Sequence, residues 1–318
     1  MEFLLQIFNG VIGIAVLYFG AEWLVKGSSA LAKKAGISQL VIGLTFVAFA
    51  TSAPELVVSL SAAMDGSPGI ALGNIVGSNI CNIALILGLC ACITPLEVKR
   101  QVLKFDAPVM VAAAILLSVF YLCSNGLNRW HGVIFLAGII AYTWYLIYSS
   151  RKENSSGEES DGEENLKELS AGKAALLAIA GITSLIFGAK LMLWSAVFFA
   201  RQMHISETVI GLTVVAVGTS LPELAASTVA AIKGEKDIAI GNVVGSNIFN
   251  ILCILGVTPL IMPLKNTKID MVDLGAMLLC SILLLPVMRS GWKISRKEGI
   301  VFLLIYAGYM AYLVINHS

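Results

Sequence analysis

The sequence predicts an all-α polytopic membrane protein, with about ten transmembrane helices in two inverted five-helix repeats. Three observations lead to this fold class. Of the 318 residues, 58% are hydrophobic and only 13% are charged, whereas soluble domains carry about 25% charged residues. Apolar runs of about 20 residues, the length needed to cross a bilayer, recur along the chain. One 48-residue segment also occurs twice.

Short polar stretches divide the apolar sequence into ten segments, and all but one of the connections between these segments are short. The N-terminal stretch MEFLLQIFNGVIG has no basic start and no small-residue cleavage site, so we interpret it as a first membrane helix and not as a signal peptide. The predicted membrane helices span residues 3–32, 38–64, 70–94, 104–124, 130–149, 173–200, 206–232, 238–262, 270–288 and 298–316.

The one long connection separates the two halves of the chain. It reads RKENSSGEESDGEENLKELSAG over residues 151–172, and it is acidic and almost without apolar side chains. Such a segment cannot bury a core, so we predict a solvated linker, with regulatory ion binding as an alternative. The predicted organisation is a first five-helix repeat over residues 1–150, the linker over 151–172, and a second, inverted repeat over 173–318.

Basic residues are distributed unequally between the two sides of the predicted membrane. Fifteen Lys and Arg residues fall on one side and four on the other. Because cytoplasmic loops carry the excess of positive charge, the linker is predicted to be cytoplasmic and both termini to lie outside. Short loops favour a multi-pass protein of a bacterial or archaeal plasma membrane, with the lipid bilayer as a partner. The net charge of +1 gives no sign of nucleic-acid binding, and the oligomeric state does not follow from the sequence.

The repeated segment defines the symmetry of the chain. Val41–Gly88 aligns with Val209–Gly256 at a constant offset of 168, without gaps, and 30 of the 48 positions are identical. The tripeptide FGA at residues 19–21 recurs at residues 187–189 with the same offset. Five helices is an odd number, so the second half enters the membrane in the opposite direction. Inverted repeats of this kind are typical of transporters, with the substrate site at the repeat interface near the midplane.

Each repeat carries a proline and a glutamate inside an apolar helix, in ATSAPE from residue 50 and GTSLPE from residue 218. Each proline lacks an N–H and frees a backbone carbonyl, which needs a helix, water or an ion as its partner at membrane depth. Carboxylates, hydroxyls and carbonyls together form a ligand set for hard cations. By helical spacing, one face holds Ala48, Thr51, Ser52 and Glu55, and its counterpart holds Ala216, Thr219, Ser220 and Glu223.

A second polar cluster follows in each repeat, GNIVGSNICN from residue 73 and GNVVGSNIFN from residue 241. Three polar residues spaced by four line one helix face in each copy. Their amide oxygens can coordinate cations without adding charge. In the alternative interpretation these side chains join helices and the glycines allow close packing, but four clusters in inverted repeats favour a binding site. The residues are Asn74, Ser78 and Asn82 in the first copy and Asn242, Ser246 and Asn250 in the second.

The charge of the predicted site indicates a mechanism. Two ionised glutamates, Glu55 and Glu223, give it a charge of about −2, and an empty site of this charge resists burial in a low-dielectric core. One Ca²⁺, two Na⁺ or two protons would neutralise it, and the neutral oxygens could hold a further Na⁺. A protein that changes sides only when loaded is an exchanger, whereas a channel does not need this property.

The paired motifs GTSLPEL and GNVVGSNIFN, duplicated and inverted, resemble those of the calcium/cation antiporter superfamily, and most of all its prokaryotic sodium/calcium exchanger branch. The resemblance covers nearly the whole chain. It implies that Glu55 and Glu223 bind Ca²⁺ and share sites with Na⁺, and that helices one and six slide as a gate. No cofactor and no enzyme activity are expected. The resemblance extends Na⁺ or Ca²⁺ coordination to Ala48, Thr51, Ser52, Ser78, Asn82, Ala216, Thr219, Ser220 and Ser246.

One position bears on ion selectivity. Potassium-dependent exchangers typically carry aspartate where this chain has Asn250, and the two remaining carboxylates argue against potassium dependence. Proton-coupled calcium exchangers usually have a GNxxE-type motif in place of GTSxPE, which favours Na⁺ without excluding H⁺. The alternatives are therefore an H⁺/Ca²⁺ antiporter and, from other classes, a cation channel or an intramembrane hydrolase. For the hydrolase, the sequence has no buried histidine, lysine dyad or paired aspartate motif.

Overall fold

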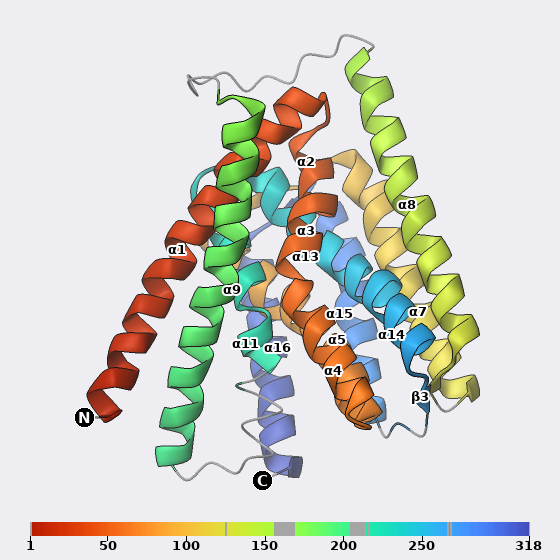
Figure 1. Cartoon of the computed structure of the whole chain (residues 1–318). Coiled ribbons are helices and arrows are strands. Elements are labelled where there is room, and N and C mark those ends of the chain that lie inside the picture. Colours follow the sequence, from red (N-terminus) through yellow and green to blue (C-terminus); the bar gives the residue numbers. More distant parts are fainter. Residues whose placement is uncertain are drawn as a thin grey trace.

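The computed structural model describes residues 2–124, 126–155, 169–203, 214, 216–265, 267 and 269–317, and it is built almost entirely of helices (Figure 1). Within these residues, eight helices are long and apolar enough to cross a membrane, and the bent pair Gln39–Thr51 and Ala53–Met64 is a ninth candidate. Of the predicted span 206–232, residues 206–213 and 215 lie outside the described residues, and the rest includes the short apolar helix Leu221–Ile232. The prediction of a polytopic, all-α membrane protein is confirmed.

The helices begin and end close to the predicted spans. The first half contains α1 (Glu2–Ala35), α2 (Gln39–Ile42), α3 (Ala48–Thr51), α4 (Ala53–Met64), α5 (Pro68–Ile80), α6 (Gly88–Ile93), α7 (Ala107–Ser124) and α8 (Arg129–Ser155). The second half contains α9 (Ala171–Gln202), α11 (Ala216–Thr219), α12 (Leu221–Ile232), α13 (Lys236–Phe249), α14 (Leu255–Ile261), α15 (Met271–Arg289) and α16 (Arg296–His317). Residues 156–168 of the predicted linker lie outside the described residues.

Short π-helical segments and strands complete the described elements. The π-helical segments are η1 (Gly43–Val47), η2 (Cys81–Leu87), η3 (Val102–Asp106) and η5 (Asn250–Ile254). The strands are β1 (Leu96–Glu97), β2 (Gly126–Leu127), β3 (Leu264–Lys265) and β4 (Lys293–Ile294). The π-helical turns were not predicted from the sequence, and two of them begin at or next to an asparagine of the second polar cluster, Asn82 in η2 and Asn250 in η5. Such turns are frequent at functional sites.

The first helices of the two halves show the inversion directly. α1 and α9 pack along each other, and Figure 1 shows α1 rising from the N-terminus while α9 runs downward beside it. Both chain termini lie at the lower end of the molecule in this view, and the end of α8 and the start of α9 lie at the upper end. Equivalent helices therefore run in opposite directions.

The strand pairs repeat this symmetry at the two ends of the bundle. β1 pairs with β4, where Leu96 lies opposite Ile294, and β2 pairs with β3, where Leu127 lies opposite Leu264. Leu96 and Leu264 occupy equivalent positions of the two repeats, 168 residues apart. Each strand pair thus takes one strand from each repeat, and the two pairings are reciprocal, as a pseudo-two-fold axis between the halves requires.

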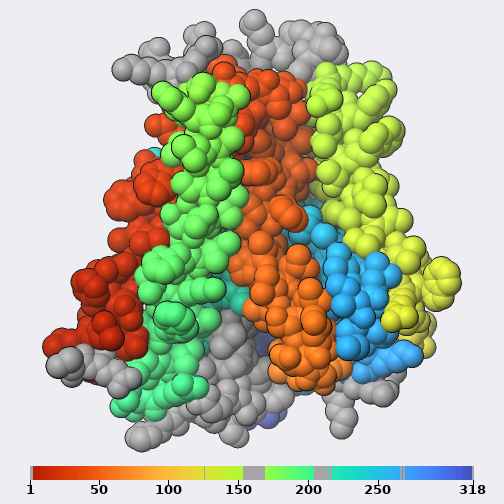
Figure 2. All heavy atoms as spheres, in the orientation of Figure 1, coloured from red at the N-terminus to blue at the C-terminus, as the bar shows by residue number. Residues whose placement is uncertain are grey.

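The outer surface is apolar in the manner of a lipid-facing surface. α1, α9 and α8 flank the first repeat's α3 and α4 in the space-filling view (Figure 2). Large side chains that are exposed on these outer helices include Phe8 and Val11 of α1, Trp194 of α9 and Trp144 of α8. Exposed apolar area of this extent marks a membrane or protein contact surface.

The centre of the molecule is formed by α13 with η5 and by α5 with η2, which are almost completely buried. α13 lies very close to the broken helix of the first repeat. A side-chain carbon added at Gly245 would lie 2.6 Å from the carbonyl oxygen of Leu44 and 2.9 Å from the Cβ of Ala48. Only glycine fits here, and its close packing brings Ser246 to the interface between the repeats.

The helix that carries the first polar cluster is broken at the serine. α3 and α4 are parts of one span that bends by 43° at Ser52, and Ser220 separates α11 from α12 with nearly the same backbone angles, φ −86° and ψ 10° against −81° and 5°. Pro54 and Pro222 occupy the first turns of α4 and α12, where no N–H is needed and proline is favoured. The glutamate that follows each proline therefore lies at a helix N-terminus.

Candidate cation site

The two broken helices meet at the repeat interface and exchange hydrogen bonds. Ser52 Oγ donates to Glu223 Oε1 at 2.9 Å, and Ser220 Oγ donates to Glu55 Oε1 at 3.0 Å. Both glutamates are fully buried. Each carboxylate is thus held by the serine of the opposite repeat, and the residues of the two predicted first clusters lie together.

The threonines extend this pattern to the asparagines of the second clusters. Thr51 Oγ1 donates to Asn242 Oδ1 at 3.0 Å, and Thr219 Oγ1 donates to Asn74 Oδ1 at 3.4 Å. Asn74 in turn donates to the backbone carbonyl of Glu55 at 3.3 Å, and Asn242 to that of Glu223 at 3.5 Å. The carboxamide oxygens of Asn74 and Asn242 are therefore engaged, and these asparagines support the site without supplying free ligands.

Several buried oxygens at this interface have no hydrogen-bond partner among the described residues. Buried polar atoms are almost always paired, so each exception needs an explanation. The unpaired oxygens are all of the kind that Ca²⁺ and Na⁺ take as ligands. They are Glu55 Oε2, Glu223 Oε2, Asn82 Oδ1, Asn250 Oδ1 and Ser246 Oγ.

The charges of the site come from two side chains. No group of three or more His, Cys, Asp or Glu able to hold a metal occurs in the described part of the chain, so the other oxygens of the set are neutral. Glu55 and Glu223 each lie in the first turn of a helix, where the macrodipole stabilises negative charge. Two buried carboxylates remain costly without a cation, because partial charges of this size do not replace the lost water. The donor set therefore fits a hard cation.

The remaining predicted ligands occupy different places at the interface. Ser78 Oγ lies within hydrogen-bond distance of Ser220 Oγ, at 3.3 Å, which joins the second cluster of one repeat to the first cluster of the other. Ala48 is buried, and its carbonyl oxygen accepts from the backbone N–H of Ser52 at 3.0 Å. Ala216 begins α11, and its side chain lies outside those described.

Two buried asparagines were missed in the sequence analysis. Asn79 Oδ1 accepts from Asn250 Nδ2 at 3.1 Å, and Asn247 Oδ1 accepts from Asn82 Nδ2 at 3.3 Å. The sequence contains a signal for them, because both belong to the GSN tripeptide that recurs at the repeat offset. Asn79 and Asn247 each follow directly after the serine of the polar face whose residues are spaced by four, so they do not lie on that face.

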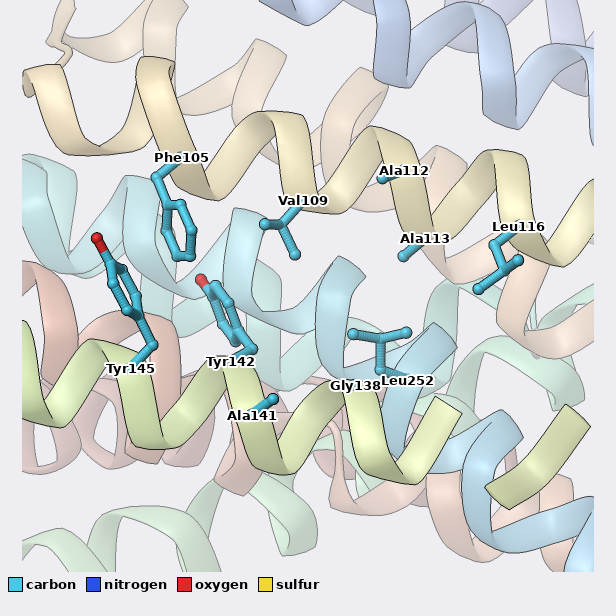
Figure 3. A pocket seen from close by; sticks show the side chains of 10 residues that line it. All are labelled: Phe105, Val109, Ala112, Ala113, Leu116, Gly138, Ala141, Tyr142, Tyr145 and Leu252. Carbon is cyan, nitrogen blue, oxygen red and sulfur yellow. The ribbon is translucent and has the colours of Figure 1, made fainter. Parts of the chain in front are cut away.

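A separate cavity of about 410 Å³ lies between α7 and α8 and is lined by apolar and aromatic side chains (Figure 3). Leu252 of η5 forms part of its wall, two residues beyond Asn250. Its lining has no carboxylate and no amide, so it lacks the ligands of the interface site. The cavity and the candidate cation site are distinct features.

Comparisons with known proteins show the family of the chain. The model of the sodium/calcium exchanger protein family matches residues 6–148 and, separately, residues 173–315. The sodium/calcium exchanger MaX1 of Methanosarcina acetivorans is 35% identical over 95% of this chain and 97% of its own. The putative antiporter CaxA of Alkalimonas amylolytica is 35% identical over 94% of this chain and 95% of its own.

A solved structure shows the same fold. The sodium-calcium exchanger NCX_Mj, soaked with Na⁺ and Sr²⁺, superimposes with a TM-score of 0.83 at 35% identity, covering 96% of this chain and 98% of that one. The match therefore extends over both repeats and the interface between them. The chain belongs to the sodium/calcium exchanger protein family.

Proposed function

We propose that the chain is a secondary antiporter that exchanges Na⁺ for Ca²⁺ across a membrane by alternating access. The ions bind between the repeats, on the two glutamates, on Ser, Thr and Asn side chains and on backbone oxygens. The observation that carries this proposal is the set of buried, unpaired oxygens headed by Glu55 Oε2 and Glu223 Oε2. Each repeat supplies one of the two carboxylates, so the proposed site requires both repeats.

Charge balance supports exchange over conduction. Glu55 and Glu223 are fully buried, and two unneutralised carboxylates in this environment are strongly unfavourable. One Ca²⁺ or two Na⁺ removes the net charge. The loaded protein can then close around the site, whereas the empty one stays open until another ion binds. Protons would also neutralise the glutamates, which keeps H⁺/Ca²⁺ exchange as the second candidate.

An asymmetry between the repeats supports alternating access. α1 packs along α12, whereas the equivalent pair, α9 and α4, makes few contacts. Glu22 of α1 also forms an ion pair with Lys233, directly after α12. The equivalent positions are Lys190 and Asp65, which carry the opposite charges, are both exposed and form no ion pair with each other in the described structure.

This asymmetry corresponds to one of two states. In this proposal the Glu22–Lys233 ion pair closes the path at its end, and the opening lies at the end of Lys190 and Asp65. In the opposite state the two repeats exchange conformations, so α1 leaves α12 and α9 approaches α4. The Glu22–Lys233 pair is then broken and a Lys190–Asp65 pair forms. Exchange of conformations between inverted repeats is the expected basis of alternating access.

The protein is proposed to lie in the plasma membrane of a bacterium or archaeon with both termini outside. The common side of the termini in Figure 1 and the excess of basic residues in the predicted cytoplasmic loops support this orientation. Labelling of a cysteine placed near the C-terminus by a membrane-impermeant maleimide in intact cells tests it. If the cysteine reacts only after the cells are permeabilised, the C-terminus lies in the cytoplasm and the proposed orientation is wrong.

Transport by the purified protein tests the function. In proteoliposomes we expect ⁴⁵Ca²⁺ uptake that is driven by an outward Na⁺ gradient and is absent when choline replaces Na⁺. Uptake driven by an outward H⁺ gradient without Na⁺ would favour the H⁺/Ca²⁺ antiporter. Passive Ca²⁺ current that needs neither gradient would favour a channel and contradict the proposal.

A further inference from the structure

Asn79 and Asn247 each hold the carboxamide of a proposed ligand that belongs to the opposite repeat. Asn250 donates Nδ2 to Asn79 Oδ1 at 3.1 Å, and Asn82 donates Nδ2 to Asn247 Oδ1 at 3.3 Å. We infer that Asn79 and Asn247 are positioning residues, which fix the side chains of Asn250 and Asn82 so that their oxygens are presented to the transported cation. The inference rests on the proposed function of the site.

The chemistry of a carboxamide makes its orientation decisive. Its oxygen can coordinate a cation, but its NH₂ group only donates and presents positive charge. Asn250 and Asn82 use the NH₂ group in the bonds to their partners, and the oxygen of each is buried without a partner among the described residues. A half-turn of either side chain would direct the NH₂ group where the oxygen is now, and would break the bond that holds it.

The partner asparagines are themselves held in place. Asn247 donates Nδ2 to Met110 Sδ at 3.6 Å, and Asn79 donates Nδ2 to Met277 Sδ at 4.0 Å. Both asparagines are at least 98% buried. Because their NH₂ groups face sulfur, which is only a weak acceptor, their oxygens remain for the ligand asparagines. The same sense of bonding occurs twice, in repeats that are inverted with respect to each other.

The need for such partners follows from the neutral ligands of this chain. A carboxylate has two equivalent oxygens, so a half-turn of its side chain changes nothing. Asn250 and Asn82 have one oxygen each, so a cation binds well only in one of two orientations. Asn79 selects this orientation for Asn250, and Asn247 selects it for Asn82. Loss of the partner lets the amide populate both orientations and weakens cation binding.

The test is a crossed set of double variants in proteoliposomes. Asn79→Ala and Asn247→Ala should each raise the half-saturating Ca²⁺ concentration for Na⁺-driven uptake about three- to tenfold, the effect of one hydrogen bond, with a smaller change in maximal rate. In an Asn250→Ala background, Asn79→Ala should have no further effect, but Asn247→Ala should keep its full effect. In an Asn82→Ala background the two results should be exchanged. Ser281→Ala, which removes a buried hydroxyl outside the site, is the control for loss of a polar group.

The possible outcomes separate this inference from the proposed function. If the wild type takes up no Ca²⁺ against a Na⁺ gradient, the proposed function fails. If the wild type is active and both single variants have the half-saturating Ca²⁺ concentration of the wild type, the positioning role is wrong. It is also wrong if each substitution has the same effect in the Asn250→Ala and Asn82→Ala backgrounds. Thermal unfolding in detergent shows which variants are folded. Asn79→Ser and Asn247→Ser, too short to reach the ligand amide, replace any alanine variant that fails to fold.

Discussion

Ser52 and Glu223, 171 residues apart in the chain, are joined by a hydrogen bond of 2.9 Å, and the equivalent bond from Ser220 to Glu55 measures 3.0 Å. Each repeat therefore supplies the charge for one half of the site and the hydroxyl for the other. Replacement of the serine in one repeat therefore removes a hydrogen bond from the carboxylate of the other repeat. This reciprocity explains why the chain carries the motif with proline and glutamate twice.

Replacing either glutamate tests the role of charge. Glu55→Gln and Glu223→Gln should each reduce Na⁺-driven Ca²⁺ uptake by about 100-fold or more, because loss of one buried charge partner costs about 3–5 kcal/mol. The same variants should unfold at a higher temperature than the wild type in ion-free detergent, because one of two buried carboxylates is gone. Addition of Ca²⁺ should stabilise the wild type, and the variants should need a Ca²⁺ concentration about 100-fold higher or more for the same stabilisation. Wild-type uptake in both variants would refute the site.

Replacing the serines tests the hydrogen bonds between the repeats. Ser52→Ala and Ser220→Ala should each raise the half-saturating Ca²⁺ concentration about tenfold or more, since a hydrogen bond to a charged group contributes about 1.5–3 kcal/mol. Ser61→Ala, on the exposed side of α4, should behave as the wild type. In a Glu223→Gln background, Ca²⁺ binding measured at equilibrium should lose most of its dependence on Ser52. If Ser52→Ala weakens Ca²⁺ binding equally in that background, Ser52 does not act through its hydrogen bond to Glu223.

Two glycines at equivalent positions provide a matched pair for stability. An alanine at Gly245 would place its Cβ 2.6 Å from the carbonyl oxygen of Leu44, whereas the space at Gly77 has no atom within 4 Å of the added carbon among those described. Gly245→Ala should therefore destabilise the protein by about 1–3 kcal/mol, the cost of overpacking, and lower its unfolding temperature in detergent. Gly77→Ala should be close to neutral. Equal effects of the two substitutions would contradict the packing asymmetry.

Cysteine pairs test the proposed exchange of conformations. One variant carries Glu22→Cys with Lys233→Cys, and the other carries Lys190→Cys with Asp65→Cys. A protease site placed in the linker reports each disulfide, because the cleaved halves then stay together on a non-reducing gel. We expect both pairs to form under oxidation during transport. Either disulfide should stop uptake until a reductant is added.

The single-cysteine variants are the controls for this experiment, because the chain has six free cysteines of its own and Cys123 is exposed. A disulfide at positions 22 and 233 should prevent reaction of a cysteine at 190 with one at 65 in the combined variant. Failure of the 190–65 pair to form, in vesicles that still exchange Na⁺ for Ca²⁺, would show that the repeats do not exchange conformations in this way.

The repeat in the sequence made much of the site predictable. The constant offset of 168 pairs Thr51, Ser52 and Glu55 with equivalent residues of the second repeat. Because the repeats are inverted, the two sets are expected at the interface between them. The bend at Ser52 could not be predicted in size, because a proline in the first turn permits a bend without setting its angle. The pairing of each serine with the glutamate of the other repeat depends on that bend and on the close approach allowed by Gly245.

The asparagines show a different limit of the sequence. Helical spacing placed Asn74, Asn82 and their counterparts on one face, but it could not tell which amide oxygens are engaged. In the structure Asn74 is engaged by Thr219, and Asn82 keeps a free oxygen because Asn247 accepts from its NH₂ group. The repeated GSN tripeptide points to Asn247 as a polar residue of interest, but no local pattern says which amide of the other repeat it contacts or that the π-helical turn η2 forms.

The most direct test of the central claim is a crystal structure with Sr²⁺ as an anomalous scatterer in place of Ca²⁺. The two-carboxylate site predicts one strong anomalous peak within coordination distance of both Glu55 Oε2 and Glu223 Oε2, which is about 2.3–2.6 Å for Ca²⁺ and slightly longer for the larger Sr²⁺. Excess Na⁺ should remove the peak. A peak that contacts neither glutamate, or one that persists unchanged in saturating Na⁺, would contradict the account.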